Sequence, residues 1–119
     1  MDGESRAKLW YELLPRVDIV VVGSDDMYWG SVKDIGRAGV SITLGQHMKV
    51  MQRVMIRFRF KGSDQKEIIE GLTAKVIWKT GDNARLEFDP PLTLGSPALQ
   101  KASYLAAYLA EQESKRSSF

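Results

Sequence analysis

The sequence predicts a mainly β protein, a six-stranded antiparallel barrel with a C-terminal α-helix and a short N-terminal helical segment. Apolar and polar residues alternate from Arg53 to Lys61, the two-residue period of a half-buried strand. Other apolar runs are separated by short turns rich in glycine, aspartate, asparagine and serine, a spacing typical of small barrels. After Ser96 the apolar spacing changes to three and four residues, which predicts a helix.

Length and composition indicate one domain. The chain has 119 residues, and no linker or internal repeat divides it, so we expect an N-terminal segment over 1–15, a barrel over 16–91 and a helix over 96–115. A net charge of +2 is too small to indicate nucleic acid or anionic lipid as a partner. The chain has no cysteine, no apolar run of roughly 18 residues and an acidic start at Met1–Glu4. We therefore expect a soluble, unprocessed, cytoplasmic protein without a membrane span.

The first half of the chain predicts a short helix and three strands. Leucine and tryptophan recur every fourth residue from Ser5 to Leu14, which suits one or two helical turns, and the proline that follows ends them. The run Val17–Val22 is rich in β-branched residues and predicts a buried strand. Tyr28–Ile35 is the expected second strand, and Val40–Leu44, after a glycine-containing bend, is the third.

The second half predicts three more strands and the helix. Val54, Ile56, Phe58 and Phe60 share the inward face of the fourth strand. The expected inward face of the fifth strand is Leu72, Ala74, Val76 and Trp78, and that of the sixth is Ala84, Leu86 and Phe88. Ser96 and Pro97 begin the helix, whose apolar stripe is Leu99, Ala102, Ala106 and Leu109. Tyr104 and Tyr108 lie beside that stripe, so the helix is expected either to pack on the barrel or to serve a homodimer or partner contact.

The residue types argue against an enzyme. His47 is the only histidine, and we interpret it as a surface loop residue, so neither a metal site nor a general base is expected. Gly36-Arg37-Ala38-Gly39 lacks the glycines and the lysine of a phosphate-binding loop. We expect no catalytic residue, no metal and no cofactor.

The arginines of the fourth strand raise the alternative of a nucleic-acid-binding barrel. Such sites interleave exposed aromatic residues with the charges, whereas Phe58 and Phe60 fall on the inward face. We therefore interpret the basic residues as a solvated face, and we expect no nucleic acid as partner. An acidic partner protein remains open.

Two short stretches carry a resemblance to a known family. The first is Leu14-Pro15-Arg16-Val17 before a strand, and the second is Asp34 to Gly39 at the bend between two strands. From about Leu14 to Pro91 the chain resembles the PilZ domains, bacterial receptors and adaptors for cyclic-di-GMP. The family pattern is Arg-x-x-x-Arg before the first strand and Asp/Asn-x-Ser-x-x-Gly after the second. Arginine forks grip phosphates and guanine edges, and the glycine allows close approach of the backbone.

The resemblance implies a ligand set of Arg16, Asp34, Gly36, Arg37 and Gly39. Glu12 stands where the first arginine of the pattern belongs, and losing one bidentate contact costs about 1.5–3 kcal/mol. Gly36 stands where the serine belongs, which removes a hydroxyl donor. Arg6 or Arg37 could compensate. Alternatively, Arg16 is an ordinary surface cation and Asp34 an ordinary turn residue.

Two functions follow from this resemblance. The favoured one is a non-catalytic adaptor with weak or lost nucleotide binding, which acts on a protein of a motility, pilus, chemosensory or exopolysaccharide system. The alternative is a functional cyclic-di-GMP receptor whose N-terminal segment closes over the nucleotide. The sequence is compatible with a monomer or a homodimer.

Overall fold

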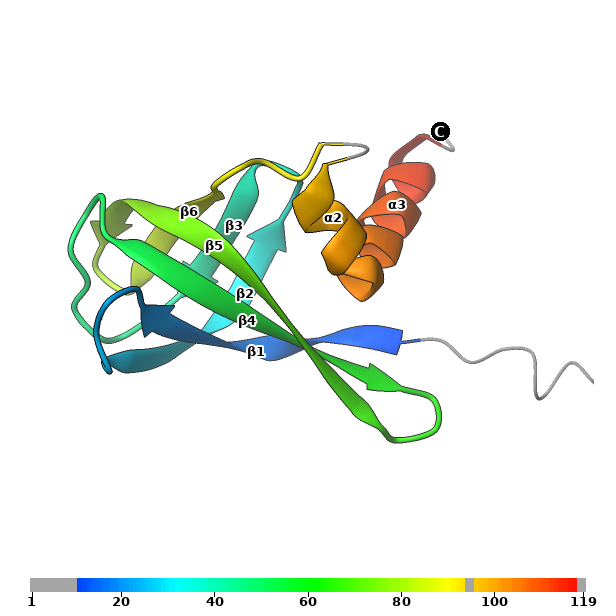
Figure 1. Cartoon of the computed structure of the whole chain (residues 1–119), viewed down its shortest axis with the longest axis horizontal. Coiled ribbons are helices and arrows are strands. Elements are labelled where there is room, and N and C mark those ends of the chain that lie inside the picture. Colours follow the sequence, from blue (N-terminus) through cyan, green and yellow to red (C-terminus); the bar gives the residue numbers. More distant parts are fainter. Residues whose placement is uncertain (1–10, 94–95, 118–119) are drawn as a thin grey trace, which may run out of the picture.

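Six antiparallel strands close into a barrel in the computed structural model, which describes residues 11–93 and 96–117 (Figure 1). The strands are β1 (Tyr11–Val21), β2 (Met27–Ile35), β3 (Gly39–Thr43), β4 (Arg53–Gly62), β5 (Glu67–Thr80) and β6 (Asn83–Phe88). Their order around the barrel is β1-β2-β3-β6-β5-β4, and β4 pairs with β1 to complete the ring. The expected barrel is therefore confirmed.

The alternation in β4 places its apolar residues in the barrel core as predicted. Val54, Ile56, Phe58 and Phe60 have no exposed surface. Phe58 meets Phe88 of β6 edge-on, with the ring centroids 6.0 Å apart, so opposite walls of the barrel touch through aromatic rings. Burying a side chain of this size contributes about 1.5–3 kcal/mol relative to leaving it exposed.

The start of β1 differs from the expected helix. The expected helical segment ran from Ser5 to Leu14; residues 5–10 lie outside the described part of the chain, and Tyr11–Leu14 belongs to the strand. Tyr11 pairs with Gly62 and Leu13 with Phe60 across the β1–β4 ladder. The four-residue spacing was misleading there because the long β4 strand offers unpaired backbone groups that the start of β1 satisfies. The β1–β4 register then shifts between Leu13 and Val17.

The inward face of β5 also differs at one residue. Trp78 was expected to point inward with Val76, but 43% of its surface is exposed. The β5–β6 register shifts between Val76 and Trp78, so that Trp78 lies opposite Arg85. An extra residue in a bulge reverses the side of every residue after it, and the sequence gives no sign of this bulge.

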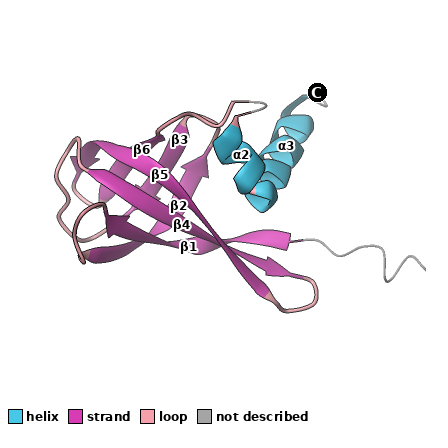
Figure 2. Ribbon diagram, viewed as in Figure 1, coloured by secondary structure: helices cyan, strands magenta, loops and turns pink. Residues whose placement is uncertain are grey.

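The C-terminal helix is present as two segments, α2 (Pro97–Lys101) and α3 (Ser103–Ser117), at one end of the barrel (Figure 2). Of the predicted stripe, Ala102 and Leu109 are buried and Ala106 is half-buried, while the side chain of Leu99 lies outside the described part. Leu105, which was not part of the predicted stripe, is buried as well. The rings of Tyr11 and Tyr104 meet at 4.4 Å between centroids, so the helix packs on the barrel.

Candidate functional site

The turn between β2 and β3 carries most of the predicted ligand-binding residues. The amide of Gly36 donates a hydrogen bond to the carbonyl oxygen of Gly39 over 2.9 Å. A Cβ atom on Gly39 would collide with the carbonyl oxygen of Leu86 and lie 2.9 Å from the Cα of Glu87. The close approach of β6 therefore requires glycine at position 39 for the fold itself, independently of any ligand.

Gly36 is unconstrained by comparison. No heavy atom outside its chain neighbours lies within 4 Å of where its Cβ would be, and its backbone φ is not left-handed. The serine of the family pattern would fit at this position without displacing another group. Packing therefore does not require glycine at position 36, and the absence of serine there only removes a hydrogen-bond donor.

Asp34 is exposed at the end of β2, after a register shift between Val32 and Asp34, and it pairs with Ser41 of β3. Within the described residues its carboxylate takes part in no hydrogen bond or ion pair. The side chain is therefore available to accept hydrogen bonds from a ligand.

Arg37 is already engaged by the C-terminal helix. Its Nε and Nη2 atoms donate to the two carboxylate oxygens of Glu113 over 2.6 and 2.8 Å, and its Nη1 donates to the carbonyl oxygen of Leu92 over 3.1 Å. The hydrogen bond and charge of Glu113 raise the pKa of Arg37 above its usual value. This fork, with 21% of the arginine side chain exposed, holds a carboxylate in the way it would hold a phosphate.

Arg16 lies on the outer wall of the barrel and also has partners. Its Nε is 3.2 Å from Oδ1 of Asp18, and its guanidinium lies over the ring of Trp29, 5.0 Å from the centroid. Asp18 is buried and accepts a second hydrogen bond, from Nη2 of Arg59 over 2.5 Å. Burial raises the pKa of Asp18, but the hydrogen bonds from Arg59 and Arg16 outweigh that effect and leave the pKa below its ordinary value.

Glu12 lies within the paired part of β1. It is exposed and opposite Lys61 of β4 in the strand register. The position that resembles the first signature arginine is therefore acidic and belongs to a strand of the barrel. The predicted compensating residue Arg6 lies outside the described residues.

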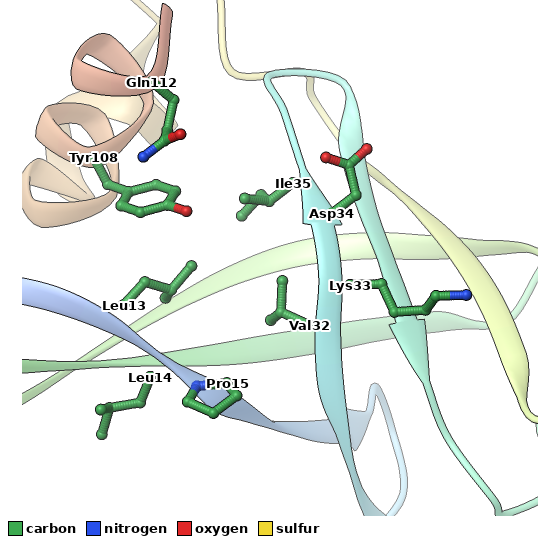
Figure 3. Close-up of a pocket in the computed structure, with 9 residues that line it drawn as sticks. All are labelled: Leu13, Leu14, Pro15, Val32, Lys33, Asp34, Ile35, Tyr108 and Gln112. Atoms are coloured by element: carbon green, nitrogen blue, oxygen red, sulfur yellow. The ribbon is translucent and has the colours of Figure 1, made fainter. Parts of the chain in front are cut away.

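Parts of the two signature stretches line one shallow pocket of about 270 Å³, and Asp34 is the one predicted ligand residue among its lining side chains (Figure 3). Its walls are the β1 residues Leu13, Leu14 and Pro15, the end of β2 from Val32 to Ile35, and Tyr108 and Gln112 of α3. Figure 3 shows the ring of Tyr108 directed toward the space between β1 and β2. Sites for small molecules usually have about 300–1,000 Å³, so this pocket cannot bury a dinucleotide while α3 stays in place.

A second concavity, of about 500 Å³, lies on the outer wall formed by β2, β3, β5 and β6. The exposed ring of Trp78 forms part of it, and the Nζ of Lys33 donates to Asn83 over 2.8 Å beside it. An aromatic face next to a cation suits a nucleobase and its phosphate. This concavity adjoins Asp34 through Lys33.

Sequence reasoning missed several of these features. Glu113, Asp18 and Trp29 were not singled out. Glu113 lies 76 residues from Arg37, and Arg59, which shares Asp18 with Arg16, lies 41 residues from Asp18, so these contacts leave no local signal. His47 is exposed in the loop after β3, as expected. Over residues 11–93 and 96–117, no three metal-ligating side chains form a cluster, and neither described helix is long and apolar enough to cross a membrane.

Comparisons with known proteins extend the resemblance. A crystal structure described as the PilZ domain of CeSA from a cellulose-synthesizing bacterium superimposes with a TM-score of 0.55 at 16% identity, over 86% of this chain and 94% of that chain. No curated protein matches the sequence. The family model of the PilZ domain matches residues 5–106. Domains of this family bind cyclic-di-GMP, and they are generally receptors or adaptors and not enzymes. The chain therefore belongs to the PilZ domain family.

Proposed function

We propose that this PilZ domain is a regulatory adaptor in bacterial cyclic-di-GMP signalling, with weak or lost nucleotide binding. It acts in the cytoplasm through contacts with a protein of a motility, pilus, chemosensory or exopolysaccharide system. The observation that carries the proposal is that both arginines of the resembling site already have carboxylate partners in the chain. Arg16 is paired with Asp18, and Arg37 is paired with Glu113.

These pairs weaken nucleotide binding because a phosphate must displace a carboxylate before it can reach the guanidinium. The pairing of Arg37 with Glu113 is bidentate, so both of these hydrogen bonds would have to break. The acidic Glu12 adds repulsion toward a dianionic ligand instead of attraction.

The position of β1 supports the same proposal. A segment that closes over a ligand has to move, but Tyr11, Glu12 and Leu13 pair with β4. Moving them would break backbone hydrogen bonds of the barrel, each worth about 0.5–1.5 kcal/mol. The pocket between β1 and β2 is also covered on one side by Tyr108 of α3.

One observation favours the receptor alternative. Asp34 is free of partners within the described residues, and the concavity beside it has the volume of a small-molecule site. In this alternative Trp78 stacks on a base, Lys33 and Arg16 meet phosphates, and the Asp34–Gly39 turn holds a guanine edge.

Isothermal titration calorimetry of the full chain with cyclic-di-GMP distinguishes the two. For the adaptor we expect no saturable heat at micromolar concentrations with the wild type, and binding in the Glu12→Arg/Gly36→Ser double variant, which restores the family pattern. Micromolar or tighter binding by the wild type that Arg16→Ala abolishes would establish the receptor instead. Thermal unfolding of each variant checks that a titration without binding heat is not caused by a misfolded protein.

A further inference from the structure

The outer wall formed by β4, β1 and β2 carries exposed apolar side chains away from the turn and the helices. Val20 of β1 lies opposite Met27 of β2 and Met55 of β4, so the three form a row across adjacent strands. Met27 is 58% exposed and Met55 38%. Trp29, on the same side of β2 as Met27, is 52% exposed. Large apolar groups gathered on one wall are uncommon on a monomer and mark interaction sites.

The adjacent row adds positive charge. Arg57 lies opposite Asp18 in the strand register, and Asp18 lies opposite Trp29. The negative charge of Asp18 is shared between Arg16 and Arg59, and Arg59 also lies 3.9 Å from a carboxylate oxygen of Glu67 on β5. With Arg57, the three arginines of this wall still outnumber the two carboxylates that they meet. Arg57 is exposed and takes part in no hydrogen bond or ion pair within the described residues. Positively charged side chains thus border the apolar row.

We call this surface the β4–β1–β2 face: its members are Arg16, Asp18, Val20, Met27, Trp29, Met55, Arg57 and Arg59. Methionine, tryptophan and arginine are the residue types that protein interfaces enrich, and tryptophan and arginine dominate their binding energy. Methionine side chains also adapt to the shape of a partner. The strands beneath are paired on both sides, so the surface is already formed and little ordering is needed on binding.

The closed ring restricts how a partner can dock. Because β4, β1 and β2 are paired on both sides, none offers a free edge to which an extended peptide could add as a further strand. The partner must use side chains. Three strands with a spacing of about 4.8 Å span about 10 Å, which is close to the diameter of an α-helix with its side chains.

We propose that the β4–β1–β2 face binds an acidic amphipathic α-helix of a partner protein. The apolar side of that helix covers Val20, Met27 and Met55, and its carboxylates meet Arg57 and the neighbouring arginines. The proposal rests on the adaptor function and names the chemistry of the adaptor's partner. It also uses a surface distinct from the turn at Gly36–Gly39.

Single-stranded nucleic acid fits this face less well. Base stacking needs successive aromatic platforms, and Trp29 is the one aromatic member of the face as defined above. Methionine and valine occupy the centre, where they suit an apolar helix side and offer no stacking surface for bases.

The test is a titration of the full chain, with isotope-labelled methionine methyl groups, by a synthetic peptide of leucine and glutamate. The peptide is roughly 18 residues long, above the length at which isolated helices are marginal, with its leucines on one side. We expect saturable shifts of the Met27 and Met55 methyl signals and of the Trp29 indole signal. A peptide with lysine in place of glutamate should cause none of them.

Substitutions on exposed positions make the test specific. Arg57→Glu should weaken binding about tenfold, because it reverses a charge at the contact. Met27→Ser should weaken it at least about fivefold. Lys49→Glu, the same charge reversal at an exposed loop residue outside the face, should leave the affinity unchanged.

Each contrary result overturns the proposal in a distinct way. Absence of binding, or equal binding by the Arg57→Glu and Lys49→Glu variants, rejects the helix site. Equal shifts of Met27 and Trp29 with an oligothymidylate would assign the face to nucleic acid, and concentration-dependent dimerisation abolished by Met27→Ser would assign it to a second copy.

If only the peptide fails to bind and calorimetry still finds no nucleotide binding, the adaptor function stands without this site. Tight nucleotide binding by the wild type rejects the adaptor function whatever the peptide does.

Discussion

The carboxylate of Glu70, on β5, accepts a hydrogen bond from the backbone amide of Leu105 over 2.8 Å, and a second one from the amide of Tyr104 over 2.9 Å. Both amides lie in the first turn of α3, where no carbonyl of the same helix is available to them. A barrel residue therefore caps a helix that is distant in sequence. In a continuous helix these two amides would donate to carbonyl oxygens of α2. Here they donate to Glu70 instead, which explains why α2 and α3 are separate segments.

Replacing Glu70 with alanine should destabilise the protein by about 1–2 kcal/mol, the usual effect of removing a helix cap. The amides of Tyr104 and Leu105 should also exchange with solvent much faster. Urea unfolding and hydrogen exchange measure the two effects. Glu67→Ala, on the same strand, is the control: Glu67 is exposed and forms only a 3.9 Å ion pair with Arg59, so the substitution should cost less than about 0.5 kcal/mol. Equal effects of the two substitutions would show that the cap does not stabilise α3.

Replacing Glu113 with glutamine should free the Arg37 fork for an anion. In the Glu12→Arg/Gly36→Ser background we expect the affinity for cyclic-di-GMP to rise about two- to fivefold, which corresponds to an ion pair of about 0.5–1 kcal/mol. Calorimetry measures the affinity. Glu111→Gln removes the same charge from α3, where Glu111 pairs with Lys115, and should leave the affinity unchanged. An unchanged affinity in Glu113→Gln would mean that Arg37 lies outside the nucleotide site.

The two glycines of the turn should respond differently to substitution. Gly39→Ala should destabilise the fold by about 1–3 kcal/mol, because its Cβ would meet the β6 backbone at Leu86. Gly36→Ser should change stability by less than about 0.5 kcal/mol, since its side chain would enter open space. Thermal unfolding of the two variants compares them directly. Comparable losses would contradict the packing argument.

Stability should fall in acid partly through Asp18. Its pKa is lower in the folded state than its ordinary value of 3.8, so its ion pairs stabilise the protein fully above that value. The contribution is lost as the pH falls below 3.8 toward the lower folded pKa. Urea unfolding measured from pH 7 down to pH 3 should show this loss in the wild type and a smaller loss in Asp18→Asn. At neutral pH the variant should be less stable, because Arg16 and Arg59 would both lose the charged carboxylate of Asp18.

Local pattern predicted most of the fold. The alternation from Arg53 to Lys61 and the turn residues between the apolar runs were enough to predict six antiparallel strands. The pattern is informative because each strand must bury one of its two faces in the barrel core. The pattern failed at Tyr11–Leu14 and at Trp78. In both places the local structure depends on a neighbouring strand. The start of β1 pairs with β4, and a bulge in the β5–β6 pairing turns Trp78 outward.

The candidate site was predictable only in part. The sequence located the turn and the departures at Glu12 and Gly36, and the ligand role of the turn residues stays a prediction. It could not reveal that Arg37 meets Glu113, because these residues are brought together only when α3 folds onto the barrel. The packing reason for Gly39 was equally hidden, since it depends on the β6 backbone.

The ionic contacts of α3 also define the direction in which it lies on the barrel. A helix carries partial positive charge at its first turn and partial negative charge at its last. The negative Glu70 meets the first turn, and the positive Arg37 meets Glu113 near the last. A helix docked the other way round would bring like charges together at both ends. The apolar stripe holds α3 to the barrel, while the charges determine its polarity.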